Sequence, residues 1–371
     1  MQTFPEIRKK LGFGCMRLPM IGEEVDIEQF KAMTDRFIEE GFNYFDTAHG
    51  YIRGKSELAI REALTSRYPR EAYLLTDKLT GTYFEKEEDI RPLFQSQLEA
   101  CGVDYFDFYL MHAQHAEVYE KFKACHAYET AFELKKEGKI RHVGISFHDS
   151  PEVLDRILTD YPELDIVQIQ FNYLDQDDPN VTSRAVYEVC EKHDKPVLVM
   201  EPVKGGKLVN LPQQAQQYFD ELQGGSNASY AIRYAAGFKN IAVVLSGMST
   251  LDQLIDNVSY MKDFQPLSEQ EHEAVKKVVE VFHSINTIPC TNCRYCVEEN
   301  SCPMDIHIPD FFRVYNNHLL YHEDGDQKRY EDIASRGSRA ADCIQCGMCE
   351  AVCPQHLPIR DLLIEVSAHF D

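Results

Sequence analysis

Residues 106–111 read Phe-Asp-Phe-Tyr-Leu-Met, and this short apolar run ends immediately before His112. Short runs of apolar, aromatic and β-branched side chains are typical of buried strands. Seven similar runs precede or follow it, and a longer amphipathic pattern that predicts a helix follows each run. The eight runs are Gly12–Leu18, Tyr44–Thr47, Tyr73–Thr76, Phe106–Met111, His142–Ser146, Ile166–Phe171, Val197–Met200 and Ile241–Ser246. Eight strands alternating with eight helices predict an α/β fold, a (β/α)8 TIM barrel.

The composition is that of a soluble protein of more than one domain. The chain has 371 residues, of which 44% are hydrophobic and 27% charged, and no uninterrupted apolar run is long enough to span a membrane. The net charge of -23 opposes binding to nucleic acid or to an anionic membrane. Residues 1–10 have no apolar core behind their positive charges, so we expect no signal peptide and a cytoplasmic location.

A domain boundary is expected shortly after the eighth strand. Ser268 followed by Glu271 predicts a capping box at the start of a helix that leaves the barrel. We place the boundary near residue 284, which gives a barrel of residues 1–284 and a small helical domain of residues 285–371. Residues 310–341 of that second domain are predicted to be helical.

The second domain carries two cysteine runs. They are Cys290-x2-Cys293-x2-Cys296-x5-Cys302-Pro303 and Cys343-x2-Cys346-x2-Cys349-x3-Cys353-Pro354. The second run has the spacing of bacterial ferredoxins, in which the fourth cysteine ligates the neighbouring cluster. The runs therefore predict two 4Fe-4S clusters with exchanged fourth ligands. One cluster would take Cys290, Cys293, Cys296 and Cys353, and the other would take Cys343, Cys346, Cys349 and Cys302.

Structural zinc is the alternative to iron-sulfur clusters at the cysteine runs. Pairs of the form C-x2-C also suit structural zinc, although two triplets that each precede Cys-Pro favour iron-sulfur clusters. The five-residue gap before Cys302 is two residues longer than the ferredoxin spacing, which makes Cys302 the weakest ligand prediction. The four scattered cysteines, Cys15, Cys101, Cys125 and Cys190, are expected to be small buried apolar residues.

Ionisable side chains mark the carboxyl ends of three predicted strands, where barrel enzymes place their catalytic groups. These residues are Asp46, Tyr51, Lys78 and His112. A carbonyl that receives hydride needs a proton donor, but a tyrosine pKa of about 10 is a mismatch of roughly 4 kcal/mol at neutral pH. A neighbouring lysine ammonium would favour the phenolate, an aspartate would keep that lysine charged, and a histidine could bind the carbonyl oxygen.

Each of the four residues has an ordinary structural explanation when it is taken alone. Asp46 could be a turn or cap residue, Tyr51 a half-buried aromatic and Lys78 a solvated cation, while His112 could be a hydrogen-bonded rim residue. Their occurrence together at successive strand ends favours catalysis.

At this point the chain resembles the aldo-keto reductase superfamily over about residues 8–262, specifically its bacterial branch with a C-terminal ferredoxin domain. The segments that carry the resemblance are residues 11–19 (LGFGCMRLP), 46–51 (DTAHGY), 76–78 (TDK), 109–112 (YLMH), 144–146 (GIS), 168–173 (QIQFNY) and 201–206 (EPVKGG). The resemblance implies that Asp46, Tyr51, Lys78 and His112 form the catalytic tetrad. It also implies that a nicotinamide cofactor, NAD(P)H, is bordered by Gly14, Met16, Ser146, Gln168, Met200, Glu201, Gly247 and Asn257.

This sequence departs from the family pattern at two cofactor positions. Thr250 stands where the family commonly has an arginine that binds phosphate, so a preference for NADPH over NADH is not predicted. Met200 stands at a position where an aromatic residue usually stacks on the cofactor. The segment Lys204-Gly205-Gly206-Lys207 is interpreted as a loop at the barrel mouth in preference to a phosphate-binding loop.

The two predicted halves handle electrons differently. A nicotinamide transfers two electrons as hydride, whereas a 4Fe-4S cluster transfers one, so a flavin in this chain or in a redox protein partner would be needed to connect them. Alternatively, the ferredoxin-type domain is structural or sensory, and NAD(P)H reduces the carbonyl unaided. We therefore expect an oxidoreductase that acts on a small-molecule carbonyl or alcohol and is linked to iron-sulfur electron transfer. The alternative is an electron-transfer subunit or scaffold with two 4Fe-4S clusters and a catalytically idle barrel.

Overall fold

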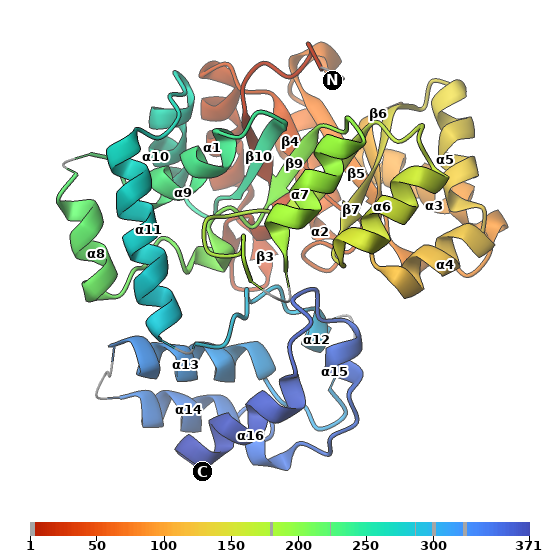
Figure 1. Cartoon of the computed structure of the whole chain (residues 1–371). Coiled ribbons are helices and arrows are strands. Elements are labelled where there is room, and N and C mark those ends of the chain that lie inside the picture. Colours follow the sequence, from red (N-terminus) through yellow and green to blue (C-terminus); the bar gives the residue numbers. More distant parts are fainter. Residues whose placement is uncertain (1–3, 179–180, 223, 286, 299–301, 322–324) are drawn as a thin grey trace. The chain divides into compact units, whose positions relative to one another are not determined.

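The computed structural model describes residues 4–178, 181–222, 224–285, 287–298, 302–321 and 325–371 (Figure 1). The chain divides into two compact units. The first comprises Met1–Asp177, Thr182–Pro202 and Ala228–Leu267, and the second comprises Asp178–Val181, Val203–Asn227 and Ser268–Asp371. Each unit is described separately below.

The first unit contains a closed barrel of eight parallel strands, in agreement with the predicted fold class. In barrel order, starting from the first, the strands are β1 (Leu11–Gly14), β10 (Ile241–Gly247), β9 (Val197–Met200), β8 (Ile166–Gln170), β7 (Ile140–Phe147), β6 (Phe106–Gln114), β5 (Leu74–Leu79) and β4 (Tyr44–Asp46). A separate antiparallel hairpin, β2 (Met20–Ile21) and β3 (Glu24–Val25), follows β1. The first strand is shorter than predicted because residues Cys15–Arg17 form a 3-10 turn, η1.

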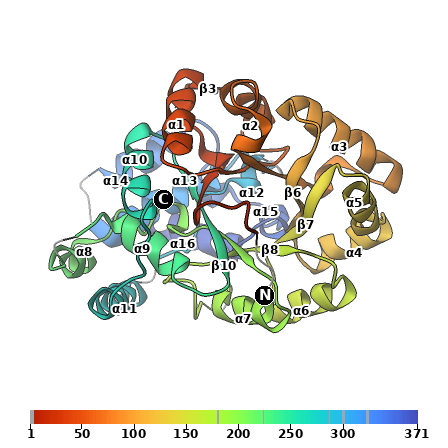
Figure 2. The same ribbon diagram turned by 90° about the horizontal axis from the view of Figure 1, so that it is seen from above.

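Helices surround this ring of strands, as the view along the barrel shows (Figure 2). They are α1 (Ile27–Glu39), α2 (Lys55–Ile60), α3 (Glu87–Cys101), α4 (Ala116–Ala124), α5 (Ala127–Lys136), α6 (Pro151–Asp160), α7 (Ser183–Lys192), α9 (Asn227–Ala236) and α10 (Leu251–Met261). The first of them shows the common pattern. Its N-cap Asp26 accepts a hydrogen bond from the Gln29 amide, and its buried face carries Phe30, Met33 and Phe37.

One end of the barrel is filled by apolar side chains. The cluster takes residues from six strands and from the N-terminal segment, namely Phe4, Tyr44, Leu74, Phe108, Leu110, Ile166, Leu198, Val243 and Leu245. Phe4 lies edge-on to Phe108, with 5.2 Å between the ring centroids. Because this packing closes the amino-terminal end of the strands, a ligand must enter at the carboxyl end.

The alternation of side chains along each strand then places the polar residues. On β5, Lys78 is four residues after the inward-facing Leu74, and on β6, His112 is four residues after Phe108. An even spacing keeps a side chain on the same face of a strand. Lys78 and His112 therefore point into the barrel near its carboxyl end, and each lies within a strand that extends beyond its predicted run.

The second unit is helical. Its helices are α8 (Gln213–Asp220), α11 (Glu269–Ser284), α12 (Tyr295–Glu298), α13 (Ile308–Tyr321), α14 (Asp326–Ala334), α15 (Met348–Ala351) and α16 (Ile359–Phe370). The predicted capping box is present at the start of α11, where Glu271 accepts a hydrogen bond from the Ser268 amide at 2.7 Å. A separate core contains Phe311, Tyr330 and Leu363.

The boundary near residue 284 stays a prediction. By contacts, α11 groups with α8 in the second unit, so that unit includes residues on both sides of the predicted boundary. The remaining short elements are η2 (Arg61–Thr65), η3 (Arg70–Ala72), η4 (Gly81–Tyr83), η5 (Lys204–Gly206) and η6 (Ala340–Asp342). Among the helices that the structure describes, none has the length and apolar character needed to cross a membrane.

Candidate active site

A buried ion pair lies at the carboxyl end of the barrel. The Lys78 ammonium donates hydrogen bonds to Asp46 Oδ1 at 2.7 Å and to the Thr47 carbonyl at 2.6 Å. Lys78 is 0% exposed and Asp46 is 3% exposed. Burial raises the pKa of the Asp46 carboxyl, and the Lys78 charge and the Gln168 amide oppose that rise. The lysine is thus held in one position by two oxygen acceptors.

The tyrosine of the predicted tetrad lies beside this ion pair. The Lys78 ammonium is 4.7 Å from the centroid of the Tyr51 ring, which is within the range of a cation-π contact. The Tyr51 ring also lies edge-on to the His112 ring, with 5.9 Å between centroids. The structure therefore brings together all four residues of the predicted tetrad.

A hydrogen bond and a backbone bulge orient the histidine. His112 Nδ1 lies 2.7 Å from Thr80 Oγ1. The next residue, Ala113, has a φ of 52°, and the pairing of β6 with β7 shifts register at this point. The Ala113 amide donates to Ser146 Oγ at 2.8 Å. The bulge thus fixes the position at which β6 presents its histidine.

The surroundings keep this histidine neutral. Burial and, next, the Lys78 charge lower the pKa of His112 well below 6.5, and His148 adds to the effect. When the Thr80 hydroxyl donates to Nδ1, the proton of the neutral imidazole lies on Nε2. That nitrogen can then donate a hydrogen bond to a substrate oxygen.

The residues predicted to border a cofactor lie at or near the same end of the barrel. Gly14 pairs with Gly247 between β1 and β10, and Ser146 pairs with Gln168 between β7 and β8. Met16 is in η1, Met200 ends β9, and Glu201 follows it with a φ of 55°. Asn257, in α10, donates to Ser246 Oγ at 2.9 Å and accepts from the Tyr260 hydroxyl at 2.5 Å. The structure thus groups these positions, and their roles stay predictions.

Cysteines of the two runs lie near one another in the second unit. Burial raises the pKa of the Cys296 thiol, and the neighbouring Cys293, Cys290, Cys353 and Cys349 raise it further. Burial also raises the pKa of the Cys349 thiol, and Glu350, Cys343 and Cys302 raise it further. Cys296 thus lies near Cys353 of the second run, and Cys349 lies near Cys302 of the first, while the division of the eight cysteines into two exchanged sets stays a prediction. Closely spaced thiols that are costly to ionise alone suit a cationic centre that binds thiolates, so the donor sets fit 4Fe-4S clusters.

Three further predictions concern the gap before Cys302, the ligand Cys346 and the four scattered cysteines. The lengthened gap before Cys302 includes residues 299–301, which lie outside the described residues. Cys346 is exposed. The four scattered cysteines, Cys15, Cys101, Cys125 and Cys190, are buried, as predicted.

Two family models match the sequence. Residues 10–280 match the aldo/keto reductase family, and residues 289–358 match a 4Fe-4S dicluster domain. The chain belongs to the aldo/keto reductase family. It is therefore an aldo-keto reductase-type oxidoreductase with a 4Fe-4S domain.

Relatives of this aldo-keto reductase include enzymes and solved structures. An NADH-specific methylglyoxal reductase of Escherichia coli is 29% identical over 206 residues, which are 51% of this chain and 59% of the relative. An uncharacterised oxidoreductase of Bacillus subtilis is 27% identical, covering 72% of this chain and 91% of its own length. A holo aldo-keto reductase of Bacillus halodurans is 25% identical with a TM-score of 0.58, covering 73% of this chain and 92% of that structure.

A further structure supports the fold. An aldo-keto reductase of Klebsiella pneumoniae, solved in complex with NADPH, has a TM-score of 0.57 and 18% identity, and the match covers 74% of this chain and 95% of the other.

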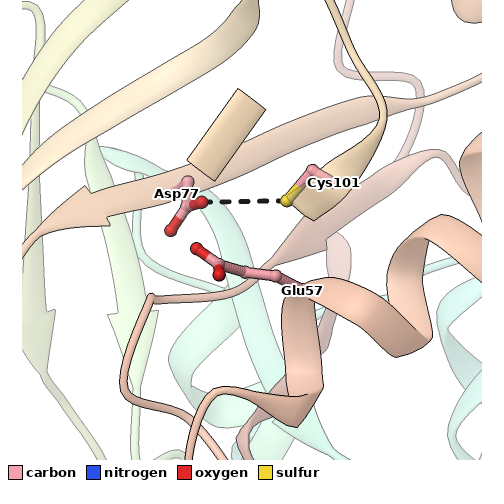
Figure 3. Close-up of side chains that lie close together, drawn as sticks. All are labelled: Glu57, Asp77 and Cys101. Carbon is pink, nitrogen blue, oxygen red and sulfur yellow. Dashed lines mark hydrogen bonds between the residues drawn. The ribbon is translucent and has the colours of Figure 1, made fainter. Parts of the chain in front are cut away.

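The sequence interpretation of this aldo-keto reductase missed a buried cluster next to the tetrad. Glu57, Asp77 and Cys101 lie with their ligand-type atoms within 4.8 Å of one another (Figure 3). Asp77 directly precedes Lys78, and strand alternation turns its side chain away from the barrel interior. An aspartate on the outer face of a buried strand was the signal available in the sequence. Thr80, the partner of His112, had no comparable signal.

A cavity of about 440 Å³ lies within the second unit. Its lining includes both lysines of the Lys204–Lys207 loop, and Cys290 is the one predicted cluster ligand among the described residues that line it. The loop is held by Lys207 Nζ, which donates to Thr287 Oγ1 at 2.9 Å and to the Ile288 carbonyl at 3.0 Å. Gly205 has a φ of 64°, and a Cβ there would lie 2.3 Å from the Thr291 carbonyl oxygen. The loop therefore depends on glycine to pack against the first cysteine run.

Proposed function

We propose that this enzyme reduces a small-molecule aldehyde or ketone, or oxidises the corresponding alcohol, with Tyr51 as the proton donor. The observation that carries the proposal is the position of the Lys78 ammonium, which is 2.7 Å from Asp46 and 4.7 Å from the Tyr51 ring centroid. A positive charge beside a phenol stabilises the phenolate that remains after proton transfer. Asp46 holds that charge in place, and neutral His112 orients the substrate oxygen.

A bound nicotinamide would supply the hydride. Its carboxamide group needs both a hydrogen-bond donor and an acceptor, and the neighbouring side chains of Ser146 and Gln168 offer a hydroxyl and a primary amide. Because Ser146 Oγ accepts from Ala113 N, its own O–H can be donated. The donor set at this end of the barrel thus fits a nicotinamide. Gly14, Met16, Met200, Glu201, Gly247 and Asn257 are proposed to complete the site.

Methylglyoxal is the first substrate to test, because the Escherichia coli relative is named for its reduction with NADH. The purified protein would be assayed with methylglyoxal and a panel of other aldehydes, ketones and sugars, with NADH and NADPH in turn. Lys78→Met would be compared with Lys139→Met, which removes an exposed lysine beyond the opposite end of β6. The proposal expects turnover that Lys78→Met abolishes and Lys139→Met leaves intact. Turnover that survives Lys78→Met would refute it.

The second unit is proposed to bind two 4Fe-4S clusters that exchange electrons with a redox partner. The two cysteine runs, and the closeness of members of both runs in the structure, support two clusters. Because hydride transfer moves two electrons and a cluster moves one, we also propose a flavin, bound to this chain or to its partner. The absorption spectrum and metal content of anaerobically purified protein test this directly. Zinc in place of iron would refute the cluster assignment.

A second candidate function is an electron-transfer subunit whose barrel serves for docking. It is favoured by the cavity beside Cys290, whose lining places the cationic side chains of Lys204, Lys207 and Arg313 next to a proposed cluster. Reducible clusters, a tight complex with a redox protein and no carbonyl turnover with either nicotinamide would support this candidate. A cytoplasmic location and the domain boundary near residue 284 also stay proposals.

A further inference from the structure

Two acidic side chains are buried behind the tetrad. Glu57, from α2, is 1% exposed and Asp77, from β5, is 0% exposed. Figure 3 shows their carboxyl groups pointing toward one another, with Cys101 beside Asp77. The Cys101 thiol donates to Asp77 Oδ2 at 3.8 Å. The two carboxyl groups thus lie together in a space that water does not reach.

The closeness of the two carboxyl groups favours a shared proton. One carboxyl oxygen of Glu57 lies within 4.8 Å of one of Asp77, and ionised carboxylates have acceptor atoms only, so a hydrogen bond between the two groups needs a proton. Two buried carboxylates at this separation cannot both be charged at low cost. Burial raises the pKa of Glu57 to about 7, and burial together with the Glu57 charge raises the pKa of Asp77 well above its usual range. One proton held between the two groups satisfies both.

The aspartate of the pair holds the backbone of the catalytic lysine. Asp77 Oδ1 accepts a hydrogen bond from the Lys78 amide at 2.8 Å. On the other side of that residue, the Lys78 carbonyl accepts from Gln97 Nε2 at 3.0 Å, and Gln97 Oε1 accepts from the Tyr109 hydroxyl at 2.6 Å. All of these groups are buried. The position of the Lys78 side chain therefore depends on Asp77.

The glutamate of the pair holds the segment that carries the tyrosine. Glu57 Oε2 and Oε1 lie 3.0 Å and 3.2 Å from His49 Nδ1. His49 is two residues before Tyr51 in the loop that follows β4. A change in the charge of Glu57 would therefore alter its interaction with this loop as well as with Asp77.

The groups that face the pair come from four elements. They are His49 in the loop after β4, Lys78 on β5, Gln97 and Cys101 on α3, and Tyr109 on β6. The same carboxyl and thiol groups have the chemistry to ligate a metal ion. A shared proton, however, explains without a cation how two buried carboxyl groups lie within 4.8 Å of each other.

We propose that Glu57 and Asp77 share one proton and act together as positioning residues for Lys78 and Tyr51. The inference rests on the proposed catalytic tetrad. Loss of the shared proton at alkaline pH places two negative charges side by side, which separates the carboxyl groups and shifts both attached segments. Activity then falls as the pair ionises, although neither residue touches the substrate.

Isosteric amides test the shared proton. In Glu57→Gln, the amide donates to the Asp77 carboxylate without a titrating proton, so kcat stays within about threefold of wild type. The fall in kcat as pH rises through about 7 disappears, while the fall caused by ionisation of Tyr51 at higher pH remains. Glu57→Met removes the hydrogen bond and lowers kcat at least about tenfold, with KM little changed. Glu88→Gln, an exposed carboxyl on α3, is the matched control and keeps the wild-type pH profile.

Two measurements that do not need turnover separate this inference from the proposed function. Infrared spectra of wild type are expected to show a protonated carboxyl band at about pH 5.5 that is lost by about pH 9, and Glu57→Gln is expected to lack that band. Hydrogen exchange at the Lys78 amide is expected to be at least about tenfold faster in Glu57→Met than in Glu57→Gln or Glu88→Gln. If the band and the exchange difference are present but no carbonyl is reduced, the pair stands and the proposed function fails. Absence of the band from wild type, its persistence in Glu57→Gln, or unchanged exchange in Glu57→Met would overturn the inference.

Discussion

Lys78 Nζ lies 2.7 Å from Asp46 Oδ1 in a part of the barrel where both side chains are buried. Burying an ion pair away from solvent costs free energy, and removing one of its two residues destabilises the fold further because the other charge stays buried and unpaired. Apolar residues in place of a buried ion pair often leave the free energy of folding unchanged or improve it. The position of this ion pair beside Tyr51 therefore points to a role in the chemistry of the site. The pair therefore links the stability of the barrel to its chemistry.

Removing the lysine alone is predicted to destabilise the protein strongly. Lys78→Met leaves the Asp46 carboxylate buried without its cation, which should lower the free energy of unfolding by about 3–5 kcal/mol. The double variant Lys78→Met/Asp46→Asn should recover part of that loss, because no unpaired charge remains. Urea unfolding followed by circular dichroism measures both. Equal stability of the single and double variants would argue against a buried charged pair.

The hydrogen bond between Thr80 and His112 is predicted to matter for catalysis. Thr80→Val has nearly the same shape as threonine but cannot donate to Nδ1, so the imidazole loses its fixed orientation and tautomer. We expect kcat to fall about tenfold, the value of a typical hydrogen bond. Nitrogen NMR of labelled histidine would show the change of tautomer directly. A Thr80→Val enzyme with wild-type kcat would contradict this role.

His112 itself is predicted not to titrate near neutrality. Because burial and then the Lys78 charge hold its pKa well below 6.5, the imidazole stays neutral from about pH 6 upward. The NMR signals of His112 should therefore be constant between about pH 6 and about pH 8, while exposed His126, whose pKa Glu87 raises, titrates. A midpoint for His112 inside this window would refute the prediction.

The carboxyl pair should make the protein less stable as pH rises. Glu57 has a pKa of about 7 in the folded chain and 4.5 as its ordinary value, so between these values the folded state binds more protons than the unfolded state. The free energy of unfolding therefore falls as pH rises from 4.5 to about 7, by on the order of 3 kcal/mol in all. Glu57→Gln should flatten this slope between about pH 5 and about pH 8. An equal slope in both proteins would contradict the shift.

Pairs of cysteine variants test the exchanged ligand sets. With two 4Fe-4S clusters, wild type should hold about eight iron atoms per chain. Cys290→Ser/Cys353→Ser removes two ligands of one cluster and should leave about four iron atoms, whereas Cys290→Ser/Cys302→Ser removes one ligand from each cluster and damages both. Anaerobic reconstitution with iron analysis distinguishes the two variants. The opposite pattern would indicate that each run holds its own cluster.

The sequence predicts the barrel well because its strands are covered on both faces. Runs such as Ile166–Gln170 are continuous enough to recognise, and the even spacing from Phe108 to His112 places the histidine inside. The bulge at Ala113 was not predictable, because it depends on the register between β6 and β7. The contact of Glu57 with Asp77 depends on how α2 packs against β5, which local patterns do not encode.

The central claim is that Tyr51 donates the proton, and a single-turnover measurement of carbonyl reduction tests it most directly. Tyr51→Phe should slow the step by about 10²–10⁴-fold while the affinity for NAD(P)H stays unchanged. Tyr105→Phe, at the opposite end of β6, removes a hydroxyl bound by Arg141 and serves as the matched control. The account predicts a slow Tyr51→Phe enzyme and a normal Tyr105→Phe enzyme. A Tyr51→Phe enzyme that reduces the substrate at the wild-type rate would contradict it.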